Sequence, residues 1–440
     1  MRQIIIIGNG ISGITCARNL RKKSTDNITI ISAESEHFFS RTALMYIYMG
    51  HMKYEHTKPY EDWFWEKNNI KLLHKRVSEI NPNNKQIILD DGEQINYDTL
   101  VVAAGSVTAM HNWPGKQLDG VHGLYSLQDL EKIESGSKNT KSAVIVGGGL
   151  IGVELAEMLH TRHISVTMLV KDKHYWGNTL PEQDAKLIEK QIWKYGITIL
   201  SQTELKEIKG EGDKVTAILT KDGRVIPCEF VGITAGVTPN ISFLKGSGIK
   251  TDKGVIINQY FETNIPDIYA IGDCAQFEQP LQGRKPIEQV WYTGRMHGET
   301  LALTLSGNRT PYRPGNWFNS AKFFDLEYQT YGLVPSKPGE GNAYFFWQHP
   351  QKDVAMGIYY NTTNNRLIGV NSYGLRLRHN FFDECLNKEK QVDFVLTHLN
   401  QAWFNPEFSK NYSPDILEEW NTTTGSKIAA TKKRKFAFHL

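Results

Sequence analysis

Two glycine-rich segments have the residue types and spacing to bind dinucleotides. Each consists of a short β-branched run, a G-x-G-x-x-G loop and a helix-like stretch. The first loop contains Gly8, Gly10, Ser12 and Gly13, and the second contains Gly147, Gly149, Leu150, Ile151 and Gly152. In a strand–turn–helix context the first glycine forms a tight turn, the second lets the backbone approach a pyrophosphate, and the third lets the helix pack on the strand. The N–H groups at the helix start bind phosphate. The chain is therefore predicted to bind two nucleotides, or one nucleotide and one cofactor.

A carboxylate follows the first loop at the distance expected for a ribose contact. Residues 28–33 form a β-branched run that leads into Glu34. About twenty residues past such a loop, a carboxylate accepts hydrogen bonds from ribose hydroxyls. The first segment therefore predicts two strands joined by a helix, with Glu34 at a ribose.

The second segment lacks a carboxylate at the equivalent strand end. Its second strand is expected to end at Val170, and the residues that follow are Lys171, Asp172, Lys173 and His174. NADH-binding domains use a carboxylate there for the 2′-hydroxyl, whereas cations suit the 2′-phosphate of NADPH. We predict that NADPH is preferred and that Lys171 contacts its phosphate. Asp172, or a loop that is merely solvated, leaves NADH as the alternative.

Two further apolar runs end in Ala-Gly. Residues 99–105 end in Ala104-Gly105, and residues 230–236 end in Ala235-Gly236. Such runs are typical of central parallel strands that are buried on both faces and turn at a ligand. We expect Ala104, Gly105 and Gly236 to lie at the two nucleotide sites.

A third motif indicates the cofactor. The segment TNIPDIYAIGD, residues 263–273, resembles the TxxxxxYAxGD motif of the pyridine nucleotide–flavin oxidoreductases, whose aspartate binds the ribityl chain of FAD. With the two loops in order, the resemblance covers about residues 1–315. It implies FAD and NAD(P)H as cofactors. It also implies an α/β fold with two Rossmann-like dinucleotide-binding domains, the NAD(P) domain being inserted in the FAD domain, plus an α+β C-terminal domain.

The resemblance implies a set of binding residues. For FAD they are Gly8, Gly10, Ser12, Gly13, Glu34, Arg41, Val77, Ala104, Gly105, Gly272, Asp273 and Trp291. For NAD(P)H they are Gly147, Gly149, Leu150, Ile151, Gly152, Glu154, Lys171 and Gly236. Glu154 is expected on the first helical turn after the second loop, close to the nicotinamide; the alternative is an acid that only complements the helix dipole. No side chain is assigned a certain catalytic role.

The branch of the family follows from the residues after Glu34. Residues 38–50 contain no cysteine, whereas flavin-to-disulfide chemistry needs a thiolate. Ser40-Arg41-x-x-Leu44 instead resembles the SRPxL loop of ferredoxin, rubredoxin and nitrite-reductase-type flavin reductases, in which the arginine approaches the FAD phosphates or the flavin. A lysine often found two residues after the leucine is here Tyr46. The resemblance thus implies Arg41 at FAD and leaves the charge at the flavin face open.

Composition excludes several classes of protein. The chain has 440 residues, 40% of them hydrophobic, and lacks the ~18 consecutive apolar residues that a spanning helix needs. Four cysteines without a CxxC pair argue against a disulfide framework or zinc ribbon. The N-terminus shows no signal peptide, so we expect a cytoplasmic protein. The net charge is +3, but the last twenty residues contribute five cations and no acid, so the rest of the chain sums to −2. A near-neutral body disfavours nucleic-acid binding.

These observations predict an organisation and a function. The expected parts are the FAD domain in two pieces, 1–115 and 250–315, an NAD(P) domain, 116–249, a C-terminal interface domain, 316–420, and a basic flexible tail, 421–440. We expect an NAD(P)H oxidoreductase that passes electrons through FAD to ferredoxin or rubredoxin. The alternatives are a peripheral quinone reductase, an NAD(P)H oxidase, or a slow flavoprotein resembling apoptosis-inducing factor. The tail, with Lys432–Lys435, is expected to dock on an acidic partner or an anionic membrane surface, the alternative being a solvated terminus.

Overall fold

The computed structural model describes residues 1–281, 283–405 and 407–429. The part of the tail that carries Lys432–Lys435 lies outside the described residues. The chain forms two compact units. Unit 1 comprises Met1–Lys171 and Thr203–Pro314, and unit 2 comprises Asp172–Gln202 and the chain from Gly315. Among the described helices, none has both the length and the apolar character to cross a membrane.

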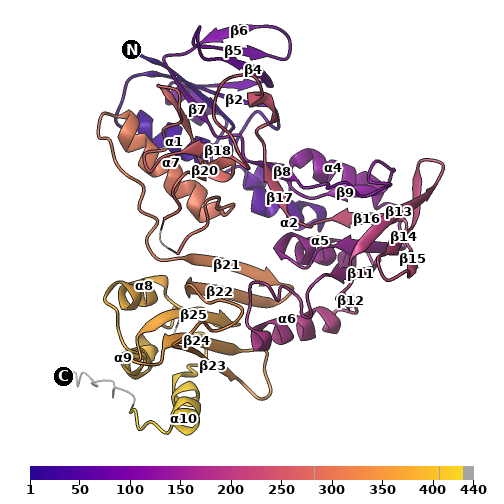
Figure 1. The fold of residues 1–440 in the computed structure, drawn as a ribbon, viewed down its shortest axis with the longest axis vertical. Coiled ribbons are helices and arrows are strands. Elements are labelled where there is room, and N and C mark those ends of the chain that lie inside the picture. Colours follow the sequence, from indigo (N-terminus) through magenta and orange to yellow (C-terminus); the bar gives the residue numbers. More distant parts are fainter. Residues whose placement is uncertain (282, 406, 430–440) are drawn as a thin grey trace. The chain divides into compact units, whose positions relative to one another are not determined.

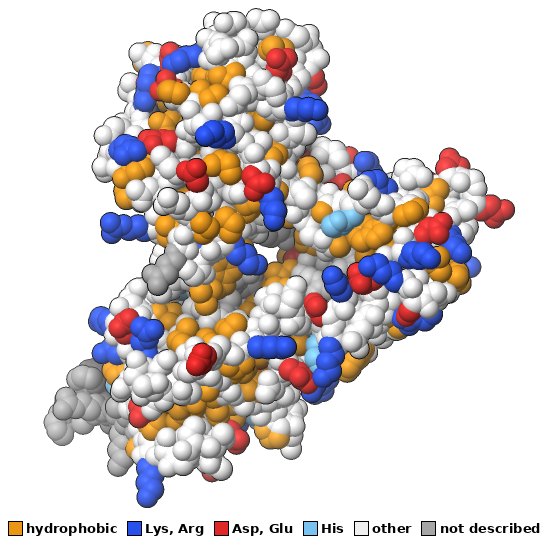
Figure 2. Space-filling view, viewed as in Figure 1, with side chains coloured by type: hydrophobic (Ala, Val, Ile, Leu, Met, Phe, Trp, Pro, Cys, Tyr) orange, Lys and Arg blue, Asp and Glu red, His pale blue; other side chains and the backbone are white. Residues whose placement is uncertain are grey.

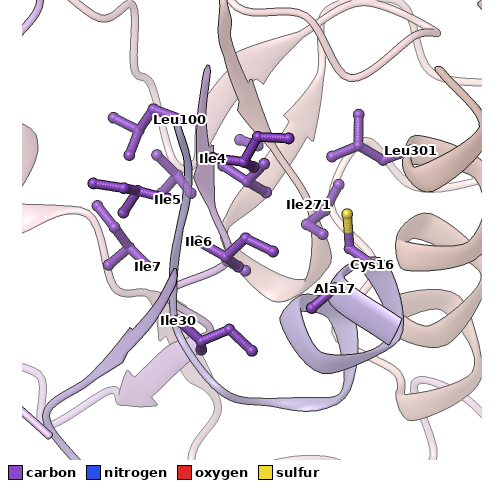
Figure 3. Close-up of a cluster of buried hydrophobic side chains, with 14 of the residues drawn as sticks. Ile4, Ile5, Ile6, Ile7, Cys16, Ala17, Ile30, Leu100, Ile271 and Leu301 are labelled. Carbon is purple, nitrogen blue, oxygen red and sulfur yellow. The ribbon is translucent and has the colours of Figure 1, made fainter. Parts of the chain in front are cut away.

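The first sheet of unit 1 is fully parallel. Its strand order is β19 (Ile268–Ala270), β7 (Thr99–Val102), β1 (Gln3–Ile7), β2 (Asn27–Ser32) and β3 (Ile70–His74). The central strand β1 is buried on both faces, which explains its unbroken run of isoleucines. Figure 3 shows these side chains packed with residues of the neighbouring elements, namely Cys16, Ala17, Ile30, Leu100, Ile271 and Leu301. Helix α1 (Ile11–Arg21) begins directly after the glycine loop.

A second parallel sheet in unit 1 repeats this arrangement. Its strand order within the unit is β9 (Val121–Gly123), β16 (Phe230–Ile233), β10 (Ser142–Val146) and β11 (Ser165–Val170). Helix α5 (Leu150–Thr161) follows β10 through the second glycine loop. Helix α4 (Leu127–Gly136) lies between β9 and β10 in sequence. Each loop is thus placed between a central strand and a helix N-terminus (Figure 1).

The remaining α-helices and strands complete unit 1. They are α2 (Leu44–Tyr48), α3 (Trp63–Lys67), β4 (Val77–Asn81), β5 (Gln86–Leu89), β6 (Gln94–Asn96), β8 (Ser106–Thr108), β13 (Leu205–Glu211), β14 (Lys214–Thr220), β15 (Val225–Pro227), β17 (Val237–Pro239), β18 (Val255–Ile257), β20 (Ala275–Phe277) and α7 (Trp291–Leu305). Helix α7 packs closely on α1 because Gly298 has no side chain: a Cβ there would lie 2.9 Å from the Cys16 nitrogen.

Unit 2 is built on an antiparallel sheet. Its strand order is β21 (Phe318–Phe323), β22 (Leu326–Gly332), β25 (Leu367–Tyr373), β24 (Ala355–Asn361) and β23 (Asn342–Gln348). The other elements are α6 (Glu182–Lys194), β12 (Thr198–Ser201), α8 (His379–Asn387), α9 (Val392–His398) and α10 (Ser413–Thr424). The predicted fold class, with parallel sheets and an α+β C-terminal part, is confirmed.

The units do not follow the expected domain boundaries everywhere. Residues 172–202 fall within the expected NAD(P) domain, but they cluster with the C-terminal part in unit 2. On the face shown in Figure 2, cationic and anionic side chains are interspersed. This distribution agrees with the near-neutral charge of the body.

Candidate functional site

The first glycine loop forms a backbone turn that only glycine allows. Gly8 has a φ of +112°, and a Cβ there would collide with the Ala103 carbonyl group. A Cβ on Gly13 would collide with the Gly8 carbonyl oxygen, so this glycine lets α1 pack against the loop. At Gly10, by contrast, an added Cβ would have no atom within 4 Å. The backbone at Gly10 therefore faces open space, as close approach of a pyrophosphate requires.

The aspartate motif lies against this loop. Gly272, with a φ of +75°, and Gly294 of α7 both face the Ser12 hydroxyl, since a Cβ on either would clash with the Ser12 oxygen. The 3-10 turn Gly272–Cys274 begins two residues after β19 ends and contains Asp273. The structure thus brings together the loop of residues 8–13 and the turn of Asp273, which the sequence separates by some 260 positions.

Glu34 and Arg41 form an ion pair. The two guanidinium nitrogens Nη1 and Nη2 donate to the two Glu34 carboxylate oxygens at 2.7 and 2.5 Å. Nη1 also donates to the Tyr125 carbonyl oxygen at 2.6 Å, and the Leu127 N–H donates to Glu34 at 2.9 Å. Burial acts to lower the pKa of Arg41, but the Glu34 hydrogen bonds outweigh it and raise that pKa. Both predicted FAD residues are therefore held in fixed positions, and Glu34 already accepts three hydrogen bonds.

Asp273 is a half-buried carboxylate with two hydroxyl partners. Its Oδ2 accepts a hydrogen bond from the Tyr125 hydroxyl at 3.1 Å. Burial raises the pKa of Asp273, while the hydrogen bond from Tyr125, the charge of Arg41 and the hydrogen bond with the Ser106 side chain act in the opposite direction. With two oxygens and about four lone pairs, the carboxylate can still accept from a ligand hydroxyl. The neighbouring Gly105 has a φ of +68°, and a Cβ there would lie 3.1 Å from the Tyr125 hydroxyl oxygen.

Other residues predicted at FAD lie on different elements of unit 1. Val77 is a buried residue of β4 and pairs with Leu89 of β5. Ala104 is half-buried at the end of β7, and Asn240 donates to its carbonyl oxygen at 3.4 Å. Trp291 is the first residue of α7. Their roles toward FAD remain predictions.

The second glycine loop repeats the geometry of the first. Gly147 has a φ of +131°, and a Cβ there would lie 2.5 Å from the Thr234 carbonyl oxygen. A Cβ on Gly152 would lie 2.6 Å from the Gly147 carbonyl oxygen, whereas one on Gly149 would have open space. Leu150 and Ile151, both half-buried, begin α5. Gly236 has a φ of +104° and also faces open space. Both loops therefore fit the pyrophosphate of a dinucleotide.

The strand end beside this loop is apolar, as the sequence indicated. Val170 is 1% exposed and packs against the loop, since a Cβ on Gly148 would lie 3.1 Å from its methyl groups. Lys171 is exposed. Lys173 and His174 belong to unit 2, where both contact Glu182, at 3.8 and 3.4 Å, and His174 also contacts Glu189. Among Lys171, Lys173 and His174, it is Lys171 that belongs to unit 1, the unit that contains the second glycine loop.

Glu154 lies one residue beyond the first turn of α5, rather than within it as expected. The first turn contains no acid, which weakens the alternative that Glu154 only complements the helix dipole. Burial and the nearby Glu157 raise the pKa of Glu154 to about 7. A carboxyl group that changes charge near neutral pH is typical of a binding or catalytic position.

Two residues of the site were not found from the sequence. The Tyr125 hydroxyl accepts a hydrogen bond from the Ser106 N–H at 2.9 Å and donates to Asp273. His297 is 1% exposed, and its Nδ1 accepts a hydrogen bond from the Gly272 N–H at 3.1 Å. Neither residue belongs to a motif, and no local pattern in the sequence marks them.

The four cysteines are free and buried. Burial raises the pKa of Cys16, Cys228 and Cys274 to about 12 and that of Cys385 to about 11. A thiolate is therefore disfavoured at neutral pH at every cysteine. A redox cycle that uses no protein thiol stays a prediction.

The chain is similar to several known proteins. The chain is 31% identical to the nitrite reductase [NAD(P)H] of Bacillus subtilis, over 62% of this chain and 34% of that protein. It is 32% identical to the NADH oxidase of Methanocaldococcus jannaschii, over 75% of this chain and 76% of that protein. The crystal structure of NADH:rubredoxin oxidoreductase from Clostridium acetobutylicum matches with a TM-score of 0.71 and 25% identity, over 89% of this chain and 96% of that one.

The chain spans about a third of the length of two of these relatives. It covers 34% of the Bacillus subtilis nitrite reductase and 37% of the assimilatory nitrate reductase electron transfer subunit of the same organism. The family model described as "Pyridine nucleotide-disulphide oxidoreductase" matches residues 2–298. Proteins of this family bind FAD and NAD(P)H. The resemblance drawn from the motifs is confirmed: this chain belongs to the pyridine nucleotide-disulphide oxidoreductase family.

Proposed function

We propose that the chain is an FAD-dependent NAD(P)H oxidoreductase whose electrons pass to a separate redox protein. The observation that carries this proposal is the presence of two glycine loops of dinucleotide-binding geometry in unit 1, the first of them packed against the turn that contains the half-buried Asp273. FAD would occupy the first loop, with its ribityl chain at Asp273, and NAD(P)H would occupy the second. When bound, FAD accepts a hydride from the nicotinamide and passes the electrons on.

In this proposal the side chains of the protein bind and orient FAD and NAD(P)H. Gly10 and the start of α1 approach the FAD pyrophosphate, and Glu34 receives the adenosine ribose. Arg41 is held by Glu34 and by the Tyr125 carbonyl, so its remaining N–H groups point to a fixed place, where they supply positive charge to the phosphates. Glu154, half-buried on α5, contacts the nicotinamide half of NAD(P)H. Catalysis then depends on holding the two ring systems in contact.

An iron–sulfur protein is the proposed acceptor. The four buried cysteines with raised pKa values argue against a thiol as the acceptor. Rubredoxin is named as the partner of the NADH:rubredoxin oxidoreductase that matches this chain. We therefore expect rubredoxin or a ferredoxin to accept electrons here.

Oxygen is the second candidate acceptor, because the chain is also 32% identical to an NADH oxidase, over 75% of its length. Steady-state assays distinguish the two. Purified protein is reconstituted with FAD, and oxidation of NAD(P)H is followed at 340 nm with rubredoxin, with a [2Fe–2S] ferredoxin, or with air alone, while an electrode records oxygen. Fast turnover that requires the iron–sulfur protein supports the first proposal. Equal turnover in air, with matching oxygen consumption, supports the oxidase. Protein that shows no flavin absorption bands after reconstitution contradicts both.

A further inference from the structure

Tyr125 lies where the two halves of the proposed FAD site meet. It follows β9 and precedes the N-cap of α4, outside every motif discussed above. Its hydroxyl accepts a hydrogen bond from the Ser106 N–H at 2.9 Å and donates one to Asp273 at 3.1 Å. The hydroxyl has one proton to donate, and that proton is directed at the carboxylate. Tyr125 therefore joins the start of β8 to the Asp273 turn.

The rest of Tyr125 contacts the ribose half of the site. The guanidinium carbon of Arg41 lies 4.5 Å from the centre of the Tyr125 ring, and Arg41 Nη1 donates to the Tyr125 carbonyl oxygen at 2.6 Å. Two residues further on, the Leu127 N–H donates to the Glu34 carboxylate at 2.9 Å. One short segment thus holds Glu34, Arg41 and Asp273 at once.

The charges explain why such a connection matters. Asp273 is half-buried, and burial disfavours its charged form and raises its pKa. The Tyr125 hydrogen bond favours the charged form, and so do the Arg41 charge and the hydrogen bond with the Ser106 side chain. A carboxylate that loses one of its donors in such a place more readily takes up a proton or turns away. In either case it would accept ribityl hydroxyls less well.

We propose that Tyr125 is a positioning residue for FAD: its hydroxyl orients the Asp273 carboxylate toward the ribityl chain, and its ring and carbonyl group orient Arg41 toward the phosphates. This inference rests on the proposed function, since it takes the first loop and Asp273 as the FAD site. Tyr125 would then connect the Glu34–Arg41 pair with the Asp273 motif at the FAD site.

The test measures the affinity of apoprotein for FAD by quenching of flavin fluorescence. Tyr125→Phe removes the hydroxyl but keeps the ring beneath Arg41. Losing a hydrogen bond to a charged group should raise the Kd by about 10-fold or more. The matched control is Tyr97→Phe, since the Tyr97 hydroxyl is buried in unit 1 without a hydrogen-bond partner in the described structure. Tyr97→Phe should leave the Kd unchanged.

A double-mutant cycle with Asp273→Asn separates positioning from a general structural effect. If Tyr125 acts through Asp273, Tyr125→Phe should change the Kd little once Asp273→Asn is present. A Kd for Tyr125→Phe equal to that of wild type, or effects of the two substitutions that simply multiply, would overturn the inference. Wild-type apoprotein that does not bind FAD would instead refute the proposed function.

Folding of the variant is checked by thermal unfolding of the apoprotein. Should Tyr125→Phe fail to fold, the same double variant decides the question. Asp273→Asn removes the charge that has lost its Tyr125 donor, so recovery of folding in the double variant supports a Tyr125–Asp273 connection. Failure to recover would show that Tyr125 serves packing, and the inference would fall.

Discussion

The Tyr373 hydroxyl donates a hydrogen bond to the Asp184 carboxylate, with 2.7 Å between the oxygens, although 189 residues separate the two in sequence. Asp184 lies on α6 and is fully buried within unit 2. It also accepts hydrogen bonds from the Tyr344 hydroxyl at 2.6 Å and from the Asn371 amide at 3.0 Å. Side chains of β23 and β25 thus surround one carboxyl group of α6, and they join this helix to the sheet of unit 2.

This carboxyl group predicts how stability depends on pH. Burial raises the pKa of Asp184 from 3.8 to about 6, despite the hydrogen bonds that oppose the shift. The folded state then binds the proton more tightly than the unfolded state. Below pH 3.8 both states are protonated and the group has no effect. As the pH rises from 3.8 through 6, the free energy of unfolding should fall by up to about 3 kcal/mol and then stay level.

Urea unfolding between pH 4 and pH 7 measures this slope. Asp184→Asn removes the titrating group, so its slope should be much smaller than that of wild type. Asp353→Asn is the control, because Asp353 is partly exposed in the same unit and pairs with Lys190 at 3.1 Å. It should keep the wild-type slope. Identical slopes for wild type and Asp184→Asn would show that this carboxyl group does not titrate in that range.

His297 should stabilise the turn that carries Asp273. Its Nδ1 accepts the Gly272 N–H, and burial lowers the pKa of His297 to about 3, so the ring is neutral at neutral pH. His297→Leu would leave a buried N–H without an acceptor, at a cost of about 1–3 kcal/mol in unfolding free energy. His297→Gln offers an amide oxygen and should lose less. Urea unfolding measures the unfolding free energy of both variants, and the amount of retained FAD shows whether the Asp273 turn is intact. A glutamine variant as damaged as the leucine variant would show that the acceptor is unimportant.

Replacing all four cysteines by alanine should leave nicotinamide-dependent reduction of ferricyanide intact. The physical reason is that burial raises every thiol pKa, so that thiolates are scarce at neutral pH. Stability should fall, since Cys16 and Cys274 are fully buried. Labelling of native protein by a thiol reagent should be slow, and labelling in urea should reach all four. Loss of activity with FAD retained would reveal a redox cysteine.

Nucleotide preference should depend on Val170 and Lys171. Lys171→Ala should weaken NADPH binding by about 1.5 kcal/mol, at the lower limit for a charged hydrogen bond because the lysine is exposed. NADH binding should not change. Lys173→Ala is the control, because Lys173 already contacts Glu182 in unit 2 and should affect neither nucleotide. Val170→Asp, which introduces the carboxylate of NADH-binding domains, should shift preference toward NADH.

Stopped-flow reduction at several nucleotide concentrations supplies the dissociation constants. If wild type is reduced faster by NADH, and Lys171→Ala changes neither nucleotide, then the strand end does not select the cofactor.

The sequence alone determined the features that depend on neighbouring residues. Runs of β-branched residues before the two glycine loops predicted the strands β1 and β10. The apolar runs that end in Ala-Gly predicted β7 and β16 as central parallel strands, because such strands are buried on both faces. The turns of both loops could be predicted from their glycines. Only glycine tolerates the positive φ of Gly8 and Gly147 and the close contacts at Gly13 and Gly152. The aspartate motif indicated FAD because it is a local pattern, which can be recognised without a structure.

Only the tertiary structure decided which distant side chains meet. Glu34 and Arg41 could each be predicted at FAD, but their ion pair depends on how the loop after β2 folds back. Tyr125 reaches Asp273 across 148 positions, and Tyr373 reaches Asp184 across 189. A tyrosine outside any motif has the same local pattern whether it packs in a core or holds a carboxylate. Burial and hydrogen-bond partners make that difference, and both arise from contacts between segments far apart in the chain.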